Sequence, residues 1–298
     1  MTLDIRPLHP IFAAEIHGFD FSSPPAQMPI EAVRDAINKY AVLVFRNTRP
    51  PSDEQHIAFS KMLGPIEQGS IIKVSGFDRR RVAHLELVDV GNLDPDGHIF
   101  SANHRRMLFR RGDRLWHTDM SFMNNRATYS MLVGHEIPPE GGDTEFADMR
   151  AVFEALPEEM QKLAASLTVE HSIWHSRQLA GFPEPTAEEL ASRPPVRHKL
   201  VHVHAGSGRK SLYIASHASH IVGWPLERGR ALIAELTRFA TQPEFVYRHK
   251  WINGDMVMWD NLSSLHRATR FEDTRYRRDM RRTTCRERMI DAADASYA

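Results

Sequence analysis

Short apolar segments separated by turn residues constrain what this chain can fold into more than any other feature. Each segment has the length and the β-branched or aromatic content of a strand. GSGRK (206–210) is predicted to join two of them, and Asn253-Gly254 is predicted to form a hairpin turn between two others. Strands at hairpin spacing favour an antiparallel barrel or sandwich with helices packed outside. The segments are TYSMLVGHEI (128–137), LTVEHSIW (167–174), KLVHVHA (199–205), SLYIAS (211–216), FVYRHKW (245–251), DMVMWDN (255–261) and RRDMRRTTC (277–285).

Helical patterns occupy the intervals between these strands. Residues 30–41 form an amphipathic pattern that leads into a buried-type strand at 41–47. In 52–63, Ser52 and Gln55 match a capping box at a helix start. Two short helices, the second opened by Pro157, are predicted over 148–167, and one long helix over 226–241.

Two segments are predicted to be irregular. Residues 74–114 are charged and rich in turn signals, which is typical of a long loop with short strands and favours a lid or insert. Residues 183–196 hold several prolines and are predicted to form a surface excursion. Since no clean boundary appears, we expect one domain over residues 1–298, mainly β with flanking helices.

Charge and cysteine content exclude some classes of protein. Lys plus Arg equals Asp plus Glu, 38 against 38, so no global field favours nucleic acid or an anionic membrane. Cys285 is the one cysteine, which excludes an intrachain disulfide and predicts a cytoplasmic protein. The N-terminal sequence lacks the layout of a signal peptide, and no apolar run is long enough to span a bilayer.

A histidine and an aspartate two residues apart, His117 and Asp119, are the first candidate site. By chance, a chain of this composition contains about two His-x-acid triplets, and the second one here, His84 with Glu86, lies in the charged segment and is predicted to be solvated. On a strand, residues two apart project from one face. His266, just past a buried-type strand, could supply a third ligand from a loop at a barrel mouth. Such a facial triad leaves three metal positions open, whereas the alternative is a hydrogen-bonded pair in a turn or core.

Seven arginines between residues 275 and 288 form the second candidate site. Strand alternation puts Arg278 and Arg282 on one face, with Met280 between them, and Arg277 and Arg281 on the other. The first face is predicted to point inward, and two buried guanidinium groups require two anions. A register slip of one residue would exchange Arg277 and Arg278. The alternative is a solvated strip or a phosphate-binding patch.

Four stretches carry a resemblance to a known family. They are LWHTDMSF (115–122), PPEGGDTEFADM (138–149), GDMVMWDNLSSLHRATR (254–270) and RRDMRRTT (277–284). In this order they resemble the Fe(II)/2-oxoglutarate dioxygenases of the taurine/2,4-D dioxygenase family. Further stretches resemble its 2,4-dichlorophenoxyacetate (aryloxyalkanoate) branch, namely GSIIKV (69–74), HAGSGRKSLYIASHASH (204–220) and FVYRHKW (245–251).

The resemblance implies a double-stranded β-helix (jelly-roll) core and an oxidoreductase. It puts Fe(2+) on His117, Asp119 and His266, and 2-oxoglutarate on Thr144 and Arg278. Arg282 would meet an anionic substrate. The implied reaction uses O2 to hydroxylate a small anion, such as 2,4-dichlorophenoxyacetate, giving a phenol, glyoxylate, succinate and CO2, with ascorbate as an expected stimulant.

Lys73 lies between apolar residues and is a candidate second contact for the substrate. The alternative is a surface lysine whose stem covers apolar neighbours.

Other functions remain open at this point. An alkylsulfonate or another small organic acid would suit the same scaffold. A non-catalytic metal-binding or nucleic-acid-binding protein would use the basic strip, but 275–288 has Tyr276 as its one stacking aromatic. His202, His204, His217 and His220 could serve a zinc site. We expect a homo-oligomer with no nucleic-acid or membrane partner.

Overall fold

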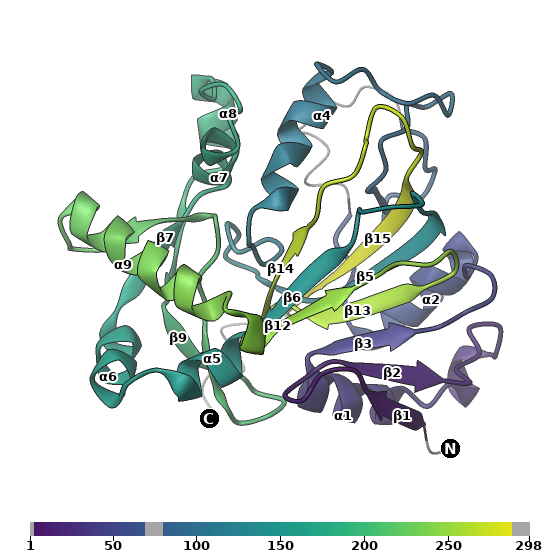
Figure 1. Cartoon of the computed structure of the whole chain (residues 1–298), viewed down its shortest axis with the longest axis horizontal. Helices are drawn as coiled ribbons and strands as arrows, with labels where there is room; N and C mark the ends of the chain where they lie inside the picture. Colours follow the sequence, from purple (N-terminus) through teal and green to yellow (C-terminus); the bar gives the residue numbers. More distant parts are fainter. Residues whose placement is uncertain (1–2, 69–79, 288–298) are drawn as a thin grey trace, which may run out of the picture.

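Two facing β-sheets form the centre of the molecule (Figure 1). The computed structural model describes residues 3–68 and 80–287, so the GSIIKV segment and Lys73 lie outside the described residues. The larger sheet has the order β1-β2-β3-β13-β5-β15-β4 and the smaller one β12-β6-β14. The larger sheet consists of β1 (Asp4–Pro7), β2 (Ala14–His17), β3 (Val42–Phe45), β4 (Val88–Asp89), β5 (Ala127–Glu136), β13 (Met256–Asp260) and β15 (Asp279–Arg286), and the smaller one of β6 (Thr144–Asp148), β12 (Val246–His249) and β14 (Ser264–Ala268).

The apolar side chains between the sheets hold this sandwich together. Leu132 and Trp259 from the larger sheet belong to one buried cluster with Phe146 of the smaller sheet. The Phe146 and Trp259 ring centroids lie 5.6 Å apart. Because alternate residues of each strand face inward, both sheets bury one apolar face here. The predicted mainly β fold with outer helices is confirmed, although β2 and β3 pair in parallel.

Two helices cover the outer face of the larger sheet. They are α1 (Ile30–Tyr40) and α2 (Asp53–Leu63), as predicted. Ile37 and Phe59 pack there against the side chains of β3, β5 and β13. The capping box is present, since the Ser52 hydroxyl accepts from the Gln55 backbone N–H and the Gln55 side chain accepts from the Ser52 N–H.

Further helices and short strands surround the smaller sheet. The predicted helices are confirmed as α5 (Met149–Ala155), α6 (Glu158–Ser166) and α9 (Leu226–Ala240). They enclose a second apolar core with two small sheets, β11-β7-β8 and β10-β9. The strands concerned are β7 (Thr168–His171), β8 (Val196–Lys199), β9 (Val201–Val203), β10 (Lys210–Leu212) and β11 (Ala218–Ile221), and one-turn 3-10 helices lie at η1 (Pro25–Gln27) and η3 (Pro243–Phe245). The predicted GSGRK turn joins β9 to β10, which pair antiparallel.

The predicted Asn253-Gly254 hairpin is wrong. A turn is present, with Gly254 at φ +94°, but β12 pairs with β6 whereas β13 pairs with β3 and β5. The turn therefore carries the chain from the smaller sheet to the larger one. Local sequence specifies the turn, but the partners of each strand are decided by which sheet buries its apolar face.

Three α-helices and one 3-10 helix lie where the sequence predicted a strand or a loop. The segment 167–174 ends as a strand at His171, because the Ser172 side chain caps a new helix, α7 (Ile173–Leu179). The predicted excursion at 183–196 contains α8 (Ala187–Ser192), with its own capping box. Between 80 and 114 the chain forms α4 (Arg105–Arg110) and the 3-10 helix η2 (Arg111–Arg114) besides β4.

The 80–114 segment packs on the open end of the sandwich (Figure 1). It joins the larger sheet through β4, which pairs antiparallel with β15, and Arg81 adds ion pairs with Asp89 of β4 and with Asp279 of β15. Whether this segment moves as a lid stays a prediction, as does the single-domain boundary at 1–298. None of the helices in the described residues is long and apolar enough to cross a membrane.

Candidate active site

The three predicted metal ligands converge. The backbones of His117 and His266 exchange two hydrogen bonds, of 2.9 and 2.7 Å, as directly opposed residues of an antiparallel bridge. This pairing puts both side chains on one face, and their ring centroids lie 4.1 Å apart. Ligand atoms of His117, Asp119 and His266 all lie within 4.8 Å of one another, and all three residues are buried.

The local structure around the ligands differs from the prediction in two places. His266 lies on β14, not on a loop. His117 forms only an isolated bridge, and the chain then turns, with Met120 at φ +56°. Asp119 thus reaches the histidines from a turn and not from a regular strand. A positive φ at a residue other than glycine is costly, so the surrounding contacts must hold this turn in place.

A set of hydrogen bonds fixes the carboxylate of Asp119. The Ser130 hydroxyl donates to Oδ2 at 2.7 Å, and Arg282 donates to Oδ1 at 2.6 Å. The side chain of Asn261 accepts from the Asp119 backbone N–H at 3.1 Å and donates to the Ser130 hydroxyl at 3.0 Å. Asn261 and Ser130 therefore orient the carboxylate in the way that outer partners orient metal ligands.

The chemistry of these donors fits a ferrous ion. Burial, as the largest cause, lowers the pKa of both His117 and His266, so each imidazole is neutral near pH 7 and keeps a lone pair. His117 Nδ1 contacts the Leu115 carbonyl at 2.8 Å, which leaves Nε2 toward the site. His266 Nε2 lies 3.8 Å from Asp119 Oδ2. Two imidazoles and one carboxylate with an open side are the donor set of non-haem iron(II) oxygenases.

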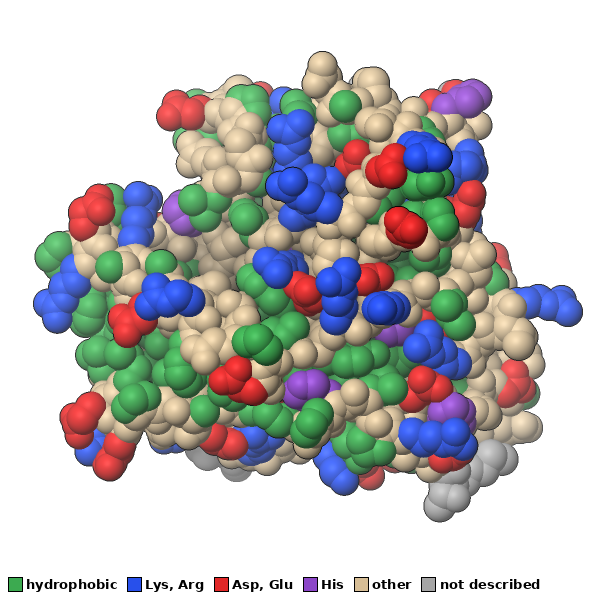
Figure 2. All heavy atoms as spheres, in the orientation of Figure 1, with side chains coloured by type: hydrophobic (Ala, Val, Ile, Leu, Met, Phe, Trp, Pro, Cys, Tyr) green, Lys and Arg blue, Asp and Glu red, His purple; other side chains and the backbone are tan. Residues whose placement is uncertain are grey.

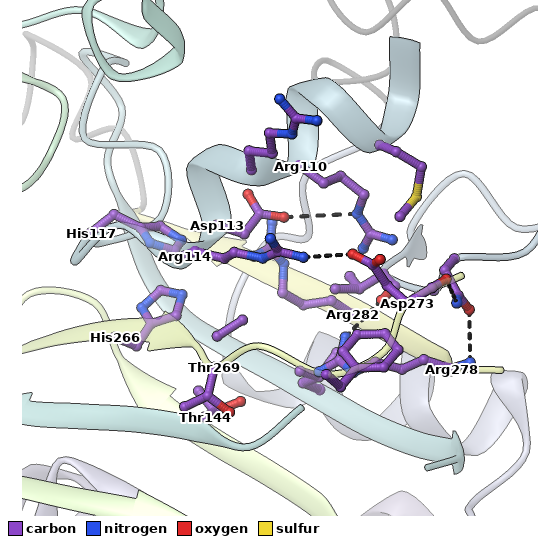
Figure 3. A pocket seen from close by; sticks show the side chains of 18 of the residues that line it. Arg110, Asp113, Arg114, His117, Thr144, His266, Thr269, Asp273, Arg278 and Arg282 are labelled. Atoms are coloured by element: carbon purple, nitrogen blue, oxygen red, sulfur yellow. Dashed lines mark hydrogen bonds and ion pairs between the residues drawn. The ribbon is translucent and has the colours of Figure 1, made fainter. Parts of the chain in front are cut away.

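A cavity opens on one side of the triad, with Thr144 beside the two histidines and Arg278 at the far end (Figure 3). Arg278 is buried, and burial lowers the pKa of its guanidinium to about 9. It donates to the carbonyls of Val90 and Gly142, while its Nε has no hydrogen-bond partner. Within the described residues it has no acidic partner. A buried guanidinium in this state requires an anionic ligand.

Asn92 and Trp251 position residues at the two ends of this cavity, Arg278 at one end and Thr144 at the other. The Asn92 side chain donates to the carbonyls of Asp273 and Tyr276, at 2.7 and 2.8 Å, and accepts from the Arg278 backbone N–H at 2.8 Å. The Trp251 indole N–H donates to the Thr144 hydroxyl at 3.0 Å.

The register of the arginine strip is the predicted one. Arg278 faces the cavity, whereas Arg277 lies at the surface and pairs with Glu136. Arg281 points to the opposite side of β15 and pairs with Asp53. Arg275 and Arg286 also contact acids, Glu272 and Glu67 respectively. The strip is thus largely neutralised within the protein, and acidic and basic side chains are interspersed over the face in Figure 2.

A second cavity lies on the other side of the triad and shares Arg282, His117 and Asp113 with the first. Phe109, Phe122 and Ile173 form an apolar part of its wall, beside several charged side chains. Arg177 and His217 also line it. Sequence reasoning missed most of these residues because they come from α4, α7 and η2, which were predicted as loop or strand.

The mid-chain histidines do not form a zinc site in the part of the chain that the structure describes. His204 pairs with Asp260 at 2.7 Å, and His220 lies 3.7 Å from Glu170. Both ring nitrogens of His202 are buried without a partner. Among the described residues, the triad is the one group of three or more potential ligands close enough to hold an ion. His84 and Glu86 lie elsewhere, in ion pairs with Glu54 and Lys61.

Comparisons with known proteins agree with this geometry. The family model "Taurine catabolism dioxygenase TauD, TfdA family" matches residues 4–284. The chain is 43% identical over 284 residues to the alpha-ketoglutarate-dependent 2,4-dichlorophenoxyacetate dioxygenase of Cupriavidus pinatubonensis, covering 95% of this chain and 98% of that protein. It is 32% identical over 286 residues to the (S)-phenoxypropionate/alpha-ketoglutarate-dioxygenase of Sphingobium herbicidovorans, covering 93% of this chain and 92% of that protein.

A solved structure extends the likeness to the fold. The crystal structure of AAD-2 in complex with Mn(II) and N-oxalylglycine superposes with a TM-score of 0.90 at 41% identity, covering 97% of this chain and 99% of that chain. The predicted jelly-roll core is confirmed. With a family model that spans nearly the whole chain and a buried facial triad in the expected place, the chain belongs to the taurine catabolism dioxygenase TauD, TfdA family.

Proposed function

We propose that this protein, an Fe(II)- and 2-oxoglutarate-dependent dioxygenase, hydroxylates aryloxyacetates such as 2,4-dichlorophenoxyacetate. The full-length likeness to a dioxygenase of that name carries the proposal. An aromatic cavity that also holds arginines, next to the triad, supports it, since such a cavity suits an aryl ring that bears a carboxylate.

Each pocket residue then has a task. His117, Asp119 and His266 hold the ferrous ion, which supplies the oxygen-activating chemistry when bound. Arg278 binds the distal carboxylate of 2-oxoglutarate by its planar fork, and the Thr144 hydroxyl contacts the same molecule. Arg282 meets the substrate carboxylate and directs the adjacent C–H bonds toward the triad. Lys73 stays a predicted second contact.

The proposed reaction couples the oxidation of 2-oxoglutarate to the hydroxylation of the substrate. One O2 is consumed as 2-oxoglutarate loses CO2 and becomes succinate, and one oxygen atom enters the substrate as a hydroxyl group. On an aryloxyacetate the hydroxyl occupies the carbon that bears the ether oxygen. This hemiacetal breaks its ether C–O bond to release a phenol and glyoxylate. The apolar walls exclude water from the reacting carbon, and the protein contributes orientation.

A substrate panel tests the proposal. The purified protein is supplied with Fe(II), ascorbate, 2-oxoglutarate and, in turn, 2,4-dichlorophenoxyacetate, phenoxyacetate, an alkylsulfonate and an alkyl sulfate. We expect equimolar phenol and succinate from the phenoxyacetates, and stimulation by ascorbate. Succinate formation driven by the sulfur compounds, with no phenol from any aryloxyacetate, would replace the proposed substrate class.

We further propose that the enzyme works in the cytoplasm as a homo-oligomer. The buried free thiol of Cys285, the chain's one cysteine, supports a reducing compartment. Light scattering of the purified protein tests the oligomeric state, and a monomer would contradict it.

A further inference from the structure

Arg177 is a buried cation in the wall of the second cavity. It lies on α7 and is only 8% exposed. Its guanidinium carbon stacks 4.2 Å from the centroid of the Phe109 ring. A Cβ on Gly112 would lie 1.7 Å from its Nη1, so the absence of a side chain at residue 112 makes room for the guanidinium.

The hydrogen-bonding capacity of Arg177 is largely unused. Its Nε is buried without a partner, and its one ion-pair contact among the described residues is Nη2 to Asp113 Oδ1, at 3.5 Å. That carboxylate is shared, because Asp113 also lies 3.8 Å from Arg110. A planar cation with five N–H donors is seldom buried with so few acceptors. The deficit indicates a missing anion.

Arg282 is shared between the triad and the site proposed for the substrate anion. Its Nη1 already donates to Asp119 at 2.6 Å. Arg282 and Arg177 line the same cavity, and Arg282 is among the causes that lower the pKa of Arg177, after burial as the largest. Among the described residues, the two cavities are together lined by seven arginines and four aspartates. Two neighbouring cations on an apolar wall favour a carboxylate between them.

We propose that Arg177 is a substrate-binding residue, which holds the carboxylate of the aryloxyacetate together with Arg282 while the ring lies among Phe109, Phe122 and Ile173. This inference rests on the proposed function. It explains why the buried guanidinium stacks on an aromatic ring, since the stack fixes the plane in which a carboxylate can accept two hydrogen bonds.

Two variants of Arg177 test the inference. Arg177→Met removes the charge and keeps the length of the side chain, and Arg177→Lys keeps the charge without the fork. For Arg177→Met we expect KM for phenoxyacetate to rise by about 10- to 100-fold, the loss of one charge-assisted contact, with KM for 2-oxoglutarate changed by less than about twofold. Arg177→Lys should recover part of the loss. Thermal unfolding checks that both variants fold.

Arg228→Met is the matched control. Arg228 stacks on Trp224 at the same 4.2 Å but lines neither cavity, so this substitution should leave both KM values unchanged. If Arg177→Met folds and leaves KM for phenoxyacetate unchanged, or raises KM for both substrates equally, the inference is wrong while the proposed function stands. If the wild-type protein forms no phenol at all, the proposed function fails, and this inference fails with it.

Discussion

The two cavities that meet at the triad hold their arginines in different ways. On the side proposed for the cosubstrate, the backbone of Arg278 is bonded to the Asn92 side chain and its guanidinium to two backbone carbonyls. On the side proposed for the substrate, Arg177 rests on an aromatic ring and has, among the described residues, one acidic partner at 3.5 Å. Fixed carbonyl partners pre-position the Arg278 cation, whereas the stack on Phe109 fixes only the plane of the Arg177 guanidinium. Under the proposed assignment, 2-oxoglutarate and the substrate are therefore held by cations that the protein supports in different ways.

Removing a metal ligand should abolish metal binding at the triad, where the two cavities meet. Loss of a residue that only orients a ligand costs about 10- to 100-fold in metal affinity, so His266→Ala should lower affinity by more than about 100-fold and remove succinate formation. Anaerobic titration with Mn(II) as the probe measures the affinity. His204→Ala, which removes a buried histidine outside the triad, is the control. Retained succinate formation in His266→Ala would contradict the assignment of the triad.

Removing the charge of Arg278 should affect the binding of 2-oxoglutarate and leave the binding of the substrate nearly unchanged. Arg278→Met leaves the carboxylate of 2-oxoglutarate without its partner, and KM for 2-oxoglutarate should rise by about 100-fold, close to the upper value for a charged hydrogen bond. KM for phenoxyacetate should change little. Arg277→Met, at the neighbouring surface position, serves as the control. A larger effect of Arg277→Met would mean that the register of β15 is shifted by one residue.

Asn92→Asp should weaken the binding of 2-oxoglutarate through the position of Arg278. The variant replaces the amide donor by an oxygen that faces the carbonyls of Asp273 and Tyr276, so the loop that carries Arg278 loses its anchor. KM for 2-oxoglutarate should rise by about tenfold, equivalent to one hydrogen bond. Asn47→Asp is matched, because Asn47 also donates to two carbonyls but lines neither cavity. Equal KM changes in both variants would refute a positioning role.

Lowering the pH should destabilise the folded protein through His171, which lies next to the helix that carries Arg177. His171 directly precedes the α7 cap, is buried, and burial lowers its pKa to about 3. The unfolded chain therefore binds this proton first, near pH 6.5, and the free energy of unfolding falls as pH drops from there toward 3. One such group contributes about 1.4 kcal/mol per pH unit. Urea unfolding at pH 7.5, 6 and 5 measures the slope, which should be shallower in His171→Phe.

The surface variant His98→Phe controls for the aromatic substitution. An unchanged slope in His171→Phe would show that other groups dominate the acid response.

The sequence by itself determined the chemistry of the site and the local elements. Side-chain alternation favoured Arg278 and Arg282 on one face and Arg281 on the other, and the capping box at Ser52 marked the start of α2. The choice between Arg277 and Arg278 depended on the register, which the sequence left open and the structure decided by placing Arg278 in the cavity. The ligand types at 117, 119 and 266 were likewise readable, although the resemblance to a family was needed to raise the pair above chance. These features depend on periodicity and residue type, which a linear sequence carries.

Only the tertiary structure decided which strands pair and which distant residues line the cavities. It placed β12 and β13 in different sheets, although the Asn253-Gly254 turn between them is locally typical of a hairpin. It also brought Arg177, Asn92 and Phe109 from helices and loops to the triad. The physical reason is that strand pairing and pocket walls are selected by the burial of apolar surface between distant segments. A buried arginine such as Arg278, which has no acidic partner among the described residues, is recognisable only when the space around it is known.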